Sequence, residues 1–485
     1  MTAMLRQYYR LLIVIMVTLP MLAACGGGGG GGGQEQSAST DTPTSDAGNT
    51  DTDDEACGVS SQKAFVRDVA RDWYLWVDEL ADPDPAPFTS AQAYLDALIE
   101  PLASDGRDPG FSYVTTQQED QASFASGAYV GFGFRYILER VNASDQMWFI
   151  DVLEGSPAAG GELRRGIEVL AIDTGAGFET IDALLSRGAT STEIFGPSEV
   201  GVERRFRVRE GESIREVTLQ KRELDTPPLA GPPLLIEREG VAPVGYFHLR
   251  GFQDNATQPL VDMATLFGQE GVTDIVVDLR YNGGGSIAEA DLLLDLIGGL
   301  AAQGEESFRL AHNRLKAEEE DISAFFQPTS GTMNPLRIAF ITGPGSASAS
   351  EMVINSLEPW FEVVMVGTDT LGKAVGQYGF AQPGCDTLLR LVSFELVNGE
   401  GLGEWYNGLA ATGRFTLCPA DDDYTRGFGD PQEASLRVAL DWLNSGVCAD
   451  AAASSSRSAM RRLYRSSDPV HSVKPLPGGR SVWQQ

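Results

Sequence analysis

The chain has 485 residues, 42% of them hydrophobic, and a formal net charge of −32. This hydrophobic fraction is typical of globular domains and excludes a disordered or multi-span membrane protein, while the length favours two or three domains. The strongly negative charge repels phosphate backbones, so nucleic acid is not expected as a partner.

The first residues predict export from the cytoplasm. Arg6 and Arg10 precede the apolar run LLIVIMVTLPMLAA, which is short for a membrane-spanning helix. The run leads into LAAC, which resembles the lipobox of bacterial lipoproteins. Residues 1–24 are therefore interpreted as a signal peptide, and Cys25 as the lipidated residue of the mature protein. The alternative is an ordinary secretory signal followed by an unmodified cysteine.

Residues 25–56 are interpreted as a flexible acidic tether. Eight glycines are followed by a segment rich in Ser, Thr and Asp, and such a composition cannot bury a core. Because Gly26 rather than an aspartate follows the lipobox cysteine, we expect a lipid anchor in the outer membrane, with a periplasmic body that begins near Cys57. Residues 448–485 reverse the sign of the charge and are interpreted as a basic disordered tail.

Four further cysteines favour disulfide bonds, because their number is even and the chain is predicted to be exported. Sequence alone does not determine the pairing, and our expectation is Cys385–Cys418 and Cys57–Cys448. No C-x-x-C pair occurs and histidines are few, so we predict no metal and no cofactor.

Residues 57–127 predict a small helical domain. In SSQKAFVRDVARDWYLWVDEL, the positions of Phe65, Val69 and Trp73 follow a helical period. The segment TSAQAYLDALIEPL predicts a second helix, with Thr89 or Ser90 as its N-cap.

Residues 128–225 change to short strands such as AYVGFGFRYIL and MWFIDVL, and they resemble a PDZ domain. The sequence GFGF matches the loop whose N–H groups receive a peptide's terminal carboxylate. The stretch VLEGSPAAGGELRRGIEVLAIDTG matches the following strand–helix–strand unit, with Ile167 in place of the usual aspartate. The resemblance implies a peptide-binding loop made of Gly131, Phe132, Gly133 and Phe134.

Residues 226–447 predict an α/β domain. The apolar strands VTDIVVDLR, LRIAFIT and FEVVMVG alternate with helical stretches, which indicates a layered sheet with functional sites at the carboxyl ends of its strands. A glycine loop, YNGGGS, and a serine run, GSASASE, both follow such strands.

The serine run fits either a nucleophile turn or an ordinary helix N-cap, since small residues at a strand-to-helix junction serve both. A nucleophilic serine needs a base. His248 falls in a strand, His312 beside a charged insertion, and His471 in the tail. Lys373 follows a buried strand among small residues, where burial lowers the pKa of an amine.

Three segments, DLRYNGGG, GSASASE and TLGKAVGQ, in this order after a PDZ-like domain, resemble the carboxyl-terminal processing (tail-specific) proteases, which are Ser-Lys peptidases. The resemblance covers residues 58–445 and implies a crotonase-like α/β protease core. In that family the nucleophile is the middle serine of the run, here Ser348, 25 residues before Lys373 as general base. A glutamine four residues further on, here Gln377, orients the lysine.

The resemblance also implies an oxyanion hole built from backbone N–H groups. We assign these to Ala349 and to Gly284, chosen among three consecutive glycines. Two positions depart from the family. Pro359 stands where some members have an acidic residue, so we assign the role of third catalytic-site residue, after Ser348 and Lys373, to Gln377. Leu371 replaces a phenylalanine.

Three charged residues near these segments receive structural interpretations. We expect Asp278 to end a strand, Arg280 to pair locally, and Glu351 to be a first-turn helix charge that faces the helix N-terminus.

Together these observations predict a multidomain α+β protein that acts as a lipid-anchored envelope serine endopeptidase. Its expected partners are protein or peptide substrates with accessible C-termini, which the PDZ-like domain captures, and the membrane, through the lipid. The alternatives are a non-catalytic PDZ scaffold lipoprotein on a protease fold and an esterase that uses the same site.

Overall fold

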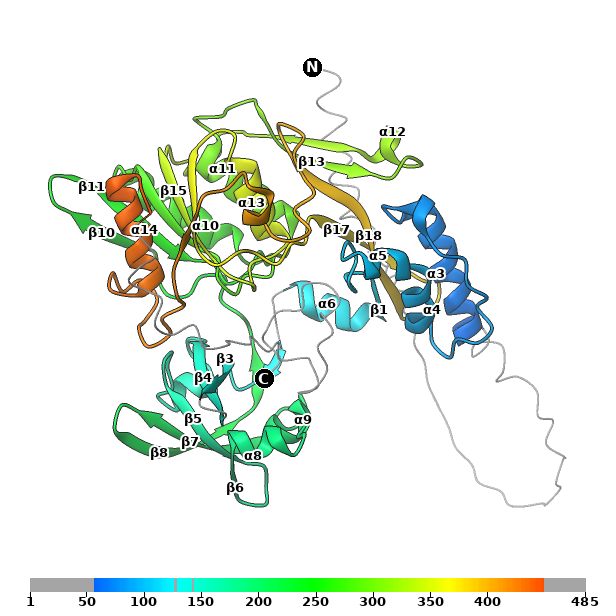
Figure 1. The fold of residues 1–485 in the computed structure, drawn as a ribbon, viewed down its shortest axis with the longest axis horizontal. Coiled ribbons are helices and arrows are strands. Elements are labelled where there is room, and N and C mark those ends of the chain that lie inside the picture. The colour runs from blue at the N-terminus through cyan, green and yellow to red at the C-terminus, as the bar shows by residue number, and fades with distance from the viewer. Residues whose placement is uncertain (1–55, 126–128, 142–143, 449–485) are drawn as a thin grey trace, which may run out of the picture. The chain divides into compact units, whose positions relative to one another are not determined.

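A computed structural model describes residues 56–125, 129–141 and 144–448 of the chain (Figure 1). The predicted signal peptide, the lipidated Cys25, nearly all of the tether and the basic tail lie outside the described residues. In the described ranges no helix combines the length and the apolar character needed to cross a bilayer.

The first described segment (residues 56–125) is mainly helical and contains one strand. Ser90 caps the second α-helix, because its side chain accepts a hydrogen bond from the N–H of Ala93. The elements are α3 (Val59–Trp73), η1 (Val77–Glu79), α4 (Ala91–Leu98), α5 (Glu100–Ser104), β1 (Tyr113–Thr116) and α6 (Gln117–Ala125).

The next segment, called the middle domain here (residues 129–224), is built on an antiparallel sheet. Its strand order is β3-β4-β5-β7-β8, with β6 beside β5, so β3 is an edge strand. The elements are β2 (Tyr129–Gly131), β3 (Phe134–Val141), β4 (Ser144–Val152), α7 (Pro157–Gly160), β5 (Glu168–Asp173), β6 (Phe178–Thr180), α8 (Ile181–Ser186), α9 (Ser191–Phe195), β7 (Glu203–Glu210), β8 (Ser213–Gln220) and β9 (Arg222–Leu224), which pairs with β2.

The third segment, called the α/β core here (residues 234–445), has a six-stranded sheet in the order β10-β11-β12-β15-β16-β19, parallel from β11 onward. The strands of this sheet are β10 (Leu234–Arg238), β11 (Val241–His248), β12 (Asp274–Asp278), β15 (Arg337–Thr342), β16 (Glu362–Gly367) and β19 (Leu417–Pro419).

Helices cover both faces of this sheet, because successive residues of each buried strand point to opposite sides. One face packs against α10 (Thr257–Gln269), α11 (Ile287–Gly298) and α13 (Ala349–Leu357), and the other against α14 (Ala434–Ser445). The multidomain α+β fold predicted from the sequence is therefore confirmed.

A second sheet joins the α/β core to the first segment. It contains β13 (Glu306–His312), β14 (Ile322–Phe325), β17 (Val375–Ala381) and β18 (Thr387–Asn398), and β1 pairs antiparallel with β18. Figure 1 shows α3 and α4 beside β17 and β18. Apolar side chains of these four elements form one buried cluster, which includes Tyr94, Leu95, Val375, Leu389 and Leu391. The short elements α12 (Ala317–Glu320) and η2 (Ala410–Thr412) complete the core.

Two disulfides correct the expected cysteine pairing. Cys57 is bonded to Cys385, at a sequence separation of 328, and Cys418 to Cys448, at a separation of 30. Cys57 directly precedes α3, and the packing of α3 on β18 brings it to the turn between β17 and β18. Cys418 lies on β19, and Cys448 follows α14 on the same face of the parallel sheet. The pairing therefore follows from tertiary contacts that the spacing of the cysteines does not reveal.

Candidate active site

The three serines of the serine run differ in their surroundings. The Ser346 hydroxyl donates to the carbonyl of Leu279, and the Ser350 hydroxyl donates to the carbonyl of Asn282, each at 2.9 Å. Both side chains are fully buried, whereas Ser348 is half-buried. Two of the hydroxyls thus tie the start of α13 and the turn before it to the loop after β12, and Ser348 is the least buried of the three serines.

The backbone of Ser348 has an unusual conformation. Its φ angle is 55° and its ψ angle −115°, a region that residues other than glycine rarely adopt. Such conformations cost of order 1–3 kcal/mol and cluster at functional sites. Ser348 is also the N-cap of α13, so the first N–H groups of the helix, beginning with Ala349, start beside it.

The candidate base, Lys373, lies two residues before β17 and is only 4% exposed. Its Nζ donates to Oε1 of Gln377 at 2.5 Å, and the amide nitrogen of Gln377 donates in turn to the carbonyl of Phe111. Within the described residues no hydrogen bond joins Lys373 to the Ser348 hydroxyl. Catalytic hydrogen bonds of this kind are often made only when substrate is bound.

Burial changes the acid–base chemistry of Lys373. Loss of water lowers the pKa of its ammonium to about 8, against the opposing effect of the Asp108 and Glu351 carboxyls, and the charge of Arg390 adds to the lowering. A lysine with this pKa is partly neutral near pH 7, so it can accept a proton from a hydroxyl.

Glu351 joins the two candidate catalytic segments. One carboxylate oxygen accepts the backbone N–H groups of Ser348, at 2.8 Å, and Lys373, at 2.9 Å, and the other accepts that of Gly372 at 2.7 Å. Glu351 does lie in the first turn of α13, as predicted, but it is fully buried, and burial raises its pKa to about 7. Its role as a bridge was missed, since its spacing also fits an ordinary helix cap.

The predicted oxyanion residues lie beside Ser348. A Cβ atom on Gly284 would stand 2.9 Å from the Cβ of Ser348 and 3.0 Å from the nitrogen of Ala349, so only glycine fits there. The N–H of Gly284 donates to Oδ1 of Asn282 at 2.9 Å. Its use as an oxyanion donor would require Asn282 to release it, and this assignment stays a prediction.

The histidines occupy other surroundings. His248 is fully buried at the end of β11, and burial lowers the pKa of its ring. The His312 ring lies 3.0 Å from the Tyr378 hydroxyl and 3.2 Å from a carboxylate oxygen of Asp321. His471 lies outside the described residues. Neither described histidine has a hydrogen bond to the serine run.

Asp278 and Arg280 belong to a buried ionic network. Asp278 is the last residue of β12, and Arg280 donates to it at 2.9 Å and to both carboxylate oxygens of Glu433 at 2.8 and 2.9 Å. The predicted local pairing of Arg280 is thus present.

The middle domain contacts the glycine loop that follows β12 in the α/β core. Arg135 on β3 donates to the carbonyl of Tyr281, and Arg165 donates to the Tyr281 hydroxyl, at 2.8 and 2.9 Å. Nearby, Arg250 and Asp151 form a bidentate pair at 2.9 and 3.0 Å. Sequence reasoning missed these contacts, because each joins residues more than 90 positions apart.

In the predicted peptide-binding loop, the aromatic side chains and the backbone have different surroundings. The rings of Phe132 and Phe134 are fully buried in the core of the middle domain. Gly131 pairs with Arg222, and Gly133 has a φ of 87° and packs against Ser156. A ligand at this loop would therefore meet backbone rather than aromatic rings.

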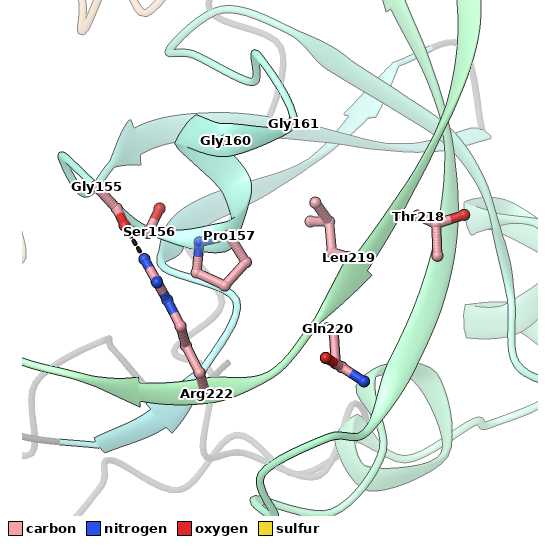
Figure 2. A pocket seen from close by; sticks show the side chains of 9 residues that line it. All are labelled: Gly155, Ser156, Pro157, Gly160, Gly161, Thr218, Leu219, Gln220 and Arg222. Carbon is pink, nitrogen blue, oxygen red and sulfur yellow. Dashed lines mark hydrogen bonds between the residues drawn. The ribbon is translucent and has the colours of Figure 1, made fainter.

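A separate cavity of about 500 Å³ lies between α7 and β8 of the middle domain (Figure 2). Arg222 donates to the carbonyl of Gly155 at its edge. The lining residues are Gly155, Ser156, Pro157, Gly160, Gly161, Thr218, Leu219, Gln220 and Arg222. None of them belongs to the serine run or to the segment around Lys373.

Two family models match this chain. The peptidase family S41 model matches residues 243–402, which include Ser348, Lys373 and Gln377, and the peptidase S41 N-terminal domain model matches residues 61–113. The chain therefore contains peptidase S41 family domains. The resemblance drawn from the three sequence segments is therefore confirmed at the level of the family.

This chain is similar to two staphylococcal proteins, each named "Probable CtpA-like serine protease". The Staphylococcus aureus protein is 24% identical over 289 residues, which cover 58% of this chain and 52% of the relative. The Staphylococcus haemolyticus protein is 20% identical over 370 residues, with 73% and 68% covered. The chain thus spans about half the length of the S. aureus relative.

A solved structure shows the same fold. An S41 protease from Bacteroides fragilis aligns with a TM-score of 0.64 and 24% identity, and the alignment covers 79% of this chain and 97% of that chain.

Proposed function

We propose that this protein is a serine endopeptidase of the carboxyl-terminal processing type, and that it cleaves protein chains through an acyl-enzyme on Ser348. The observation that carries the proposal is the difference among the three serines. Ser346 and Ser350 are buried and bonded to carbonyls, while Ser348 is half-buried in a strained turn at the start of α13.

In the proposed mechanism, neutral Lys373 takes the hydroxyl proton of Ser348 while the oxygen attacks the peptide carbonyl. The N–H of Ala349 faces the oxyanion that forms, together with a backbone donor from the glycine loop that follows β12. The Lys373 ammonium then protonates the leaving amine as the peptide C–N bond breaks. Water, deprotonated by Lys373, hydrolyses the ester and restores the serine. Throughout, Gln377 accepts one N–H of the lysine and holds the amine in place.

The test is to map the fragments of a denatured protein by mass spectrometry after incubation with wild type and variants. Ser348→Ala and Lys373→Ala should abolish cleavage, and Lys373→Arg should fail as well, because a guanidinium does not release its proton in this range. Near wild-type cleavage by Lys373→Ala would refute the Ser-Lys pair. Substrate binding without cleavage by the wild type would instead indicate a scaffold.

The middle domain is proposed to be a PDZ domain that captures substrate C-termini. The glycine loop of residues 131–134 leads directly into β3, and β3 is the edge strand of its sheet. An extended peptide can add to such an edge, with its carboxylate at the backbone of the loop. Titration should show that a peptide binds more tightly than its C-terminal amide. Equal affinity would remove the carboxylate from the model.

Membrane attachment through Cys25 is proposed from the sequence alone. Cys25→Ala should either leave the membrane fraction or remain there at a larger size, with its signal peptide uncleaved. A variant that stays membrane-bound at the same size would exclude the lipid anchor.

A further inference from the structure

A turn at the end of the first segment, residues 108–112, holds a buried carboxylate. Asp108 is fully buried and accepts hydrogen bonds from the N–H of Ser112 at 3.0 Å, the Ser112 hydroxyl at 2.6 Å and the Tyr74 hydroxyl at 3.1 Å. The Ser112 oxygen is itself an acceptor for the N–H of Val392, so its proton is committed to Asp108. Burial raises the pKa of the Asp108 carboxyl, and the hydrogen bonds from Ser112 and Tyr74 act in the opposite direction, because each donor favours the ionised form.

The same turn contacts the candidate base. The carbonyl of Phe111 accepts the amide N–H of Gln377, and the Phe111 ring lies 5.2 Å from Nζ of Lys373. Because the amide nitrogen of Gln377 is bound to this carbonyl, its amide oxygen must point the other way, toward Lys373. The orientation of Gln377 is therefore decided by a residue 266 positions earlier in the chain.

Few charges act on Lys373. Asp108 and Glu351 favour its ammonium form, and Arg390 opposes it. The guanidinium of Arg390 is paired with Asp120 through two hydrogen bonds, at 2.7 and 2.6 Å, so its positive charge is largely balanced. Glu351 accepts three backbone N–H groups. Of the two carboxyls that favour the ammonium form, Asp108 has the larger effect, and it lies outside the segments that carry Ser348 and Lys373.

We propose that the turn of residues 108–112 is a positioning element of the general base, in which the Phe111 carbonyl orients Gln377 and the Asp108 carboxylate balances the charge that Lys373 acquires. The proposal rests on the proposed roles of Ser348 and Lys373. When the lysine takes the serine proton, a positive charge appears in a buried site, and a fixed carboxylate nearby stabilises it. The first segment thereby becomes part of the active site.

The experiment measures, as a function of pH, the rate at which a fluorophosphonate probe labels Ser348. In wild type the rate should rise through the pKa of Lys373. Asp108→Asn removes the charge but keeps the shape, so the midpoint should move to lower pH by roughly half a unit or more, and the plateau rate should fall several-fold. Asp105→Asn is the matched control, because Asp105 is an exposed carboxylate in the same segment, paired with Arg107. It should leave the midpoint unchanged.

An unchanged midpoint in Asp108→Asn overturns the proposal, even if the variant melts at a lower temperature, because a merely structural role lowers stability without moving a titration. If Asp108→Asn does not fold, Tyr74→Phe decides the question. It removes one donor from the carboxylate and should shift the midpoint in the same direction by less, and no shift again overturns the proposal. Failure to label Ser348 in wild type would instead refute the proposed function.

Discussion

Replacing Lys373 by methionine should stabilise the protein while it abolishes cleavage. Burial lowers the pKa of Lys373 from its ordinary value of 10.5 to about 8. One pKa unit corresponds to about 1.4 kcal/mol, so burial of the charged Lys373 lowers the free energy of unfolding by about 3 kcal/mol at any pH below 8. Methionine of similar shape removes this cost, but it leaves the amide oxygen of Gln377 without its donor, which costs about 1–2 kcal/mol. We expect Lys373→Met to gain about 1–2 kcal/mol at pH 7.

The pH dependence of the folding stability provides a second test of this prediction. Because the folded-state pKa is the lower one, the unfolded chain binds more protons between pH 8 and pH 10.5, and the stability of the wild type rises across that window. The advantage of Lys373→Met should therefore vanish at pH 10. The assay is thermal unfolding of both proteins at pH 7 and pH 10, with Lys316→Met as the control at a less buried lysine. A variant that is destabilised equally at both pH values would show that Lys373 is not desolvated.

Three further outcomes are expected. The value of kcat/KM should rise about tenfold from pH 7 to pH 9, because Lys373, with a pKa of about 8, goes from about one tenth to about nine tenths neutral. A kcat/KM that does not change with pH would exclude Lys373 as the base. Ser346→Ala should lower the free energy of unfolding by about 1–3 kcal/mol, measured by denaturant titration, because its buried hydroxyl makes two hydrogen bonds. Ser348→Ala should lower it by about 0.5–1 kcal/mol, as expected for an N-cap serine, and a larger loss for Ser348→Ala than for Ser346→Ala would contradict the assigned roles. Cys57→Ser with Cys385→Ser should cost about 2–5 kcal/mol, and an unchanged thermal midpoint would show that this disulfide does not hold the first segment.

The sequence was sufficient for features that depend on local pattern. Buried strands followed by glycine or serine loops predicted a parallel sheet with a site at the carboxyl ends of its strands, and β12 and β15 end in this way. The identity of the middle serine came from the family spacing to Lys373, because composition alone does not distinguish it from Ser346 or Ser350. Their separate roles became visible only with the contacts of each hydroxyl.

Features that depend on contacts between distant segments could not be predicted. Phe111 reaches Gln377 across 266 residues, and Asp108 lies in a turn whose sequence, DPGFS, reads as an ordinary loop. The spacing of Glu351 fits a helix cap, so its link to Lys373 gave no signal. The cysteine pairing failed for the same reason, because a helix packed on β18 decides which sulfurs meet.

The contact between Phe111 and Gln377 also has a consequence for the order in which the protein is made. A ribosome adds roughly 5–20 residues per second, so the turn that orients the base is synthesised well before the strand that carries Gln377. The apolar faces of α3 and α4 must wait equally long for β17 and β18, and such non-local pairing is slow to form. A nascent chain therefore carries Ser348 without an assembled base. The Ser348 hydroxyl is not activated until β17 and β18 have packed against α3 and α4.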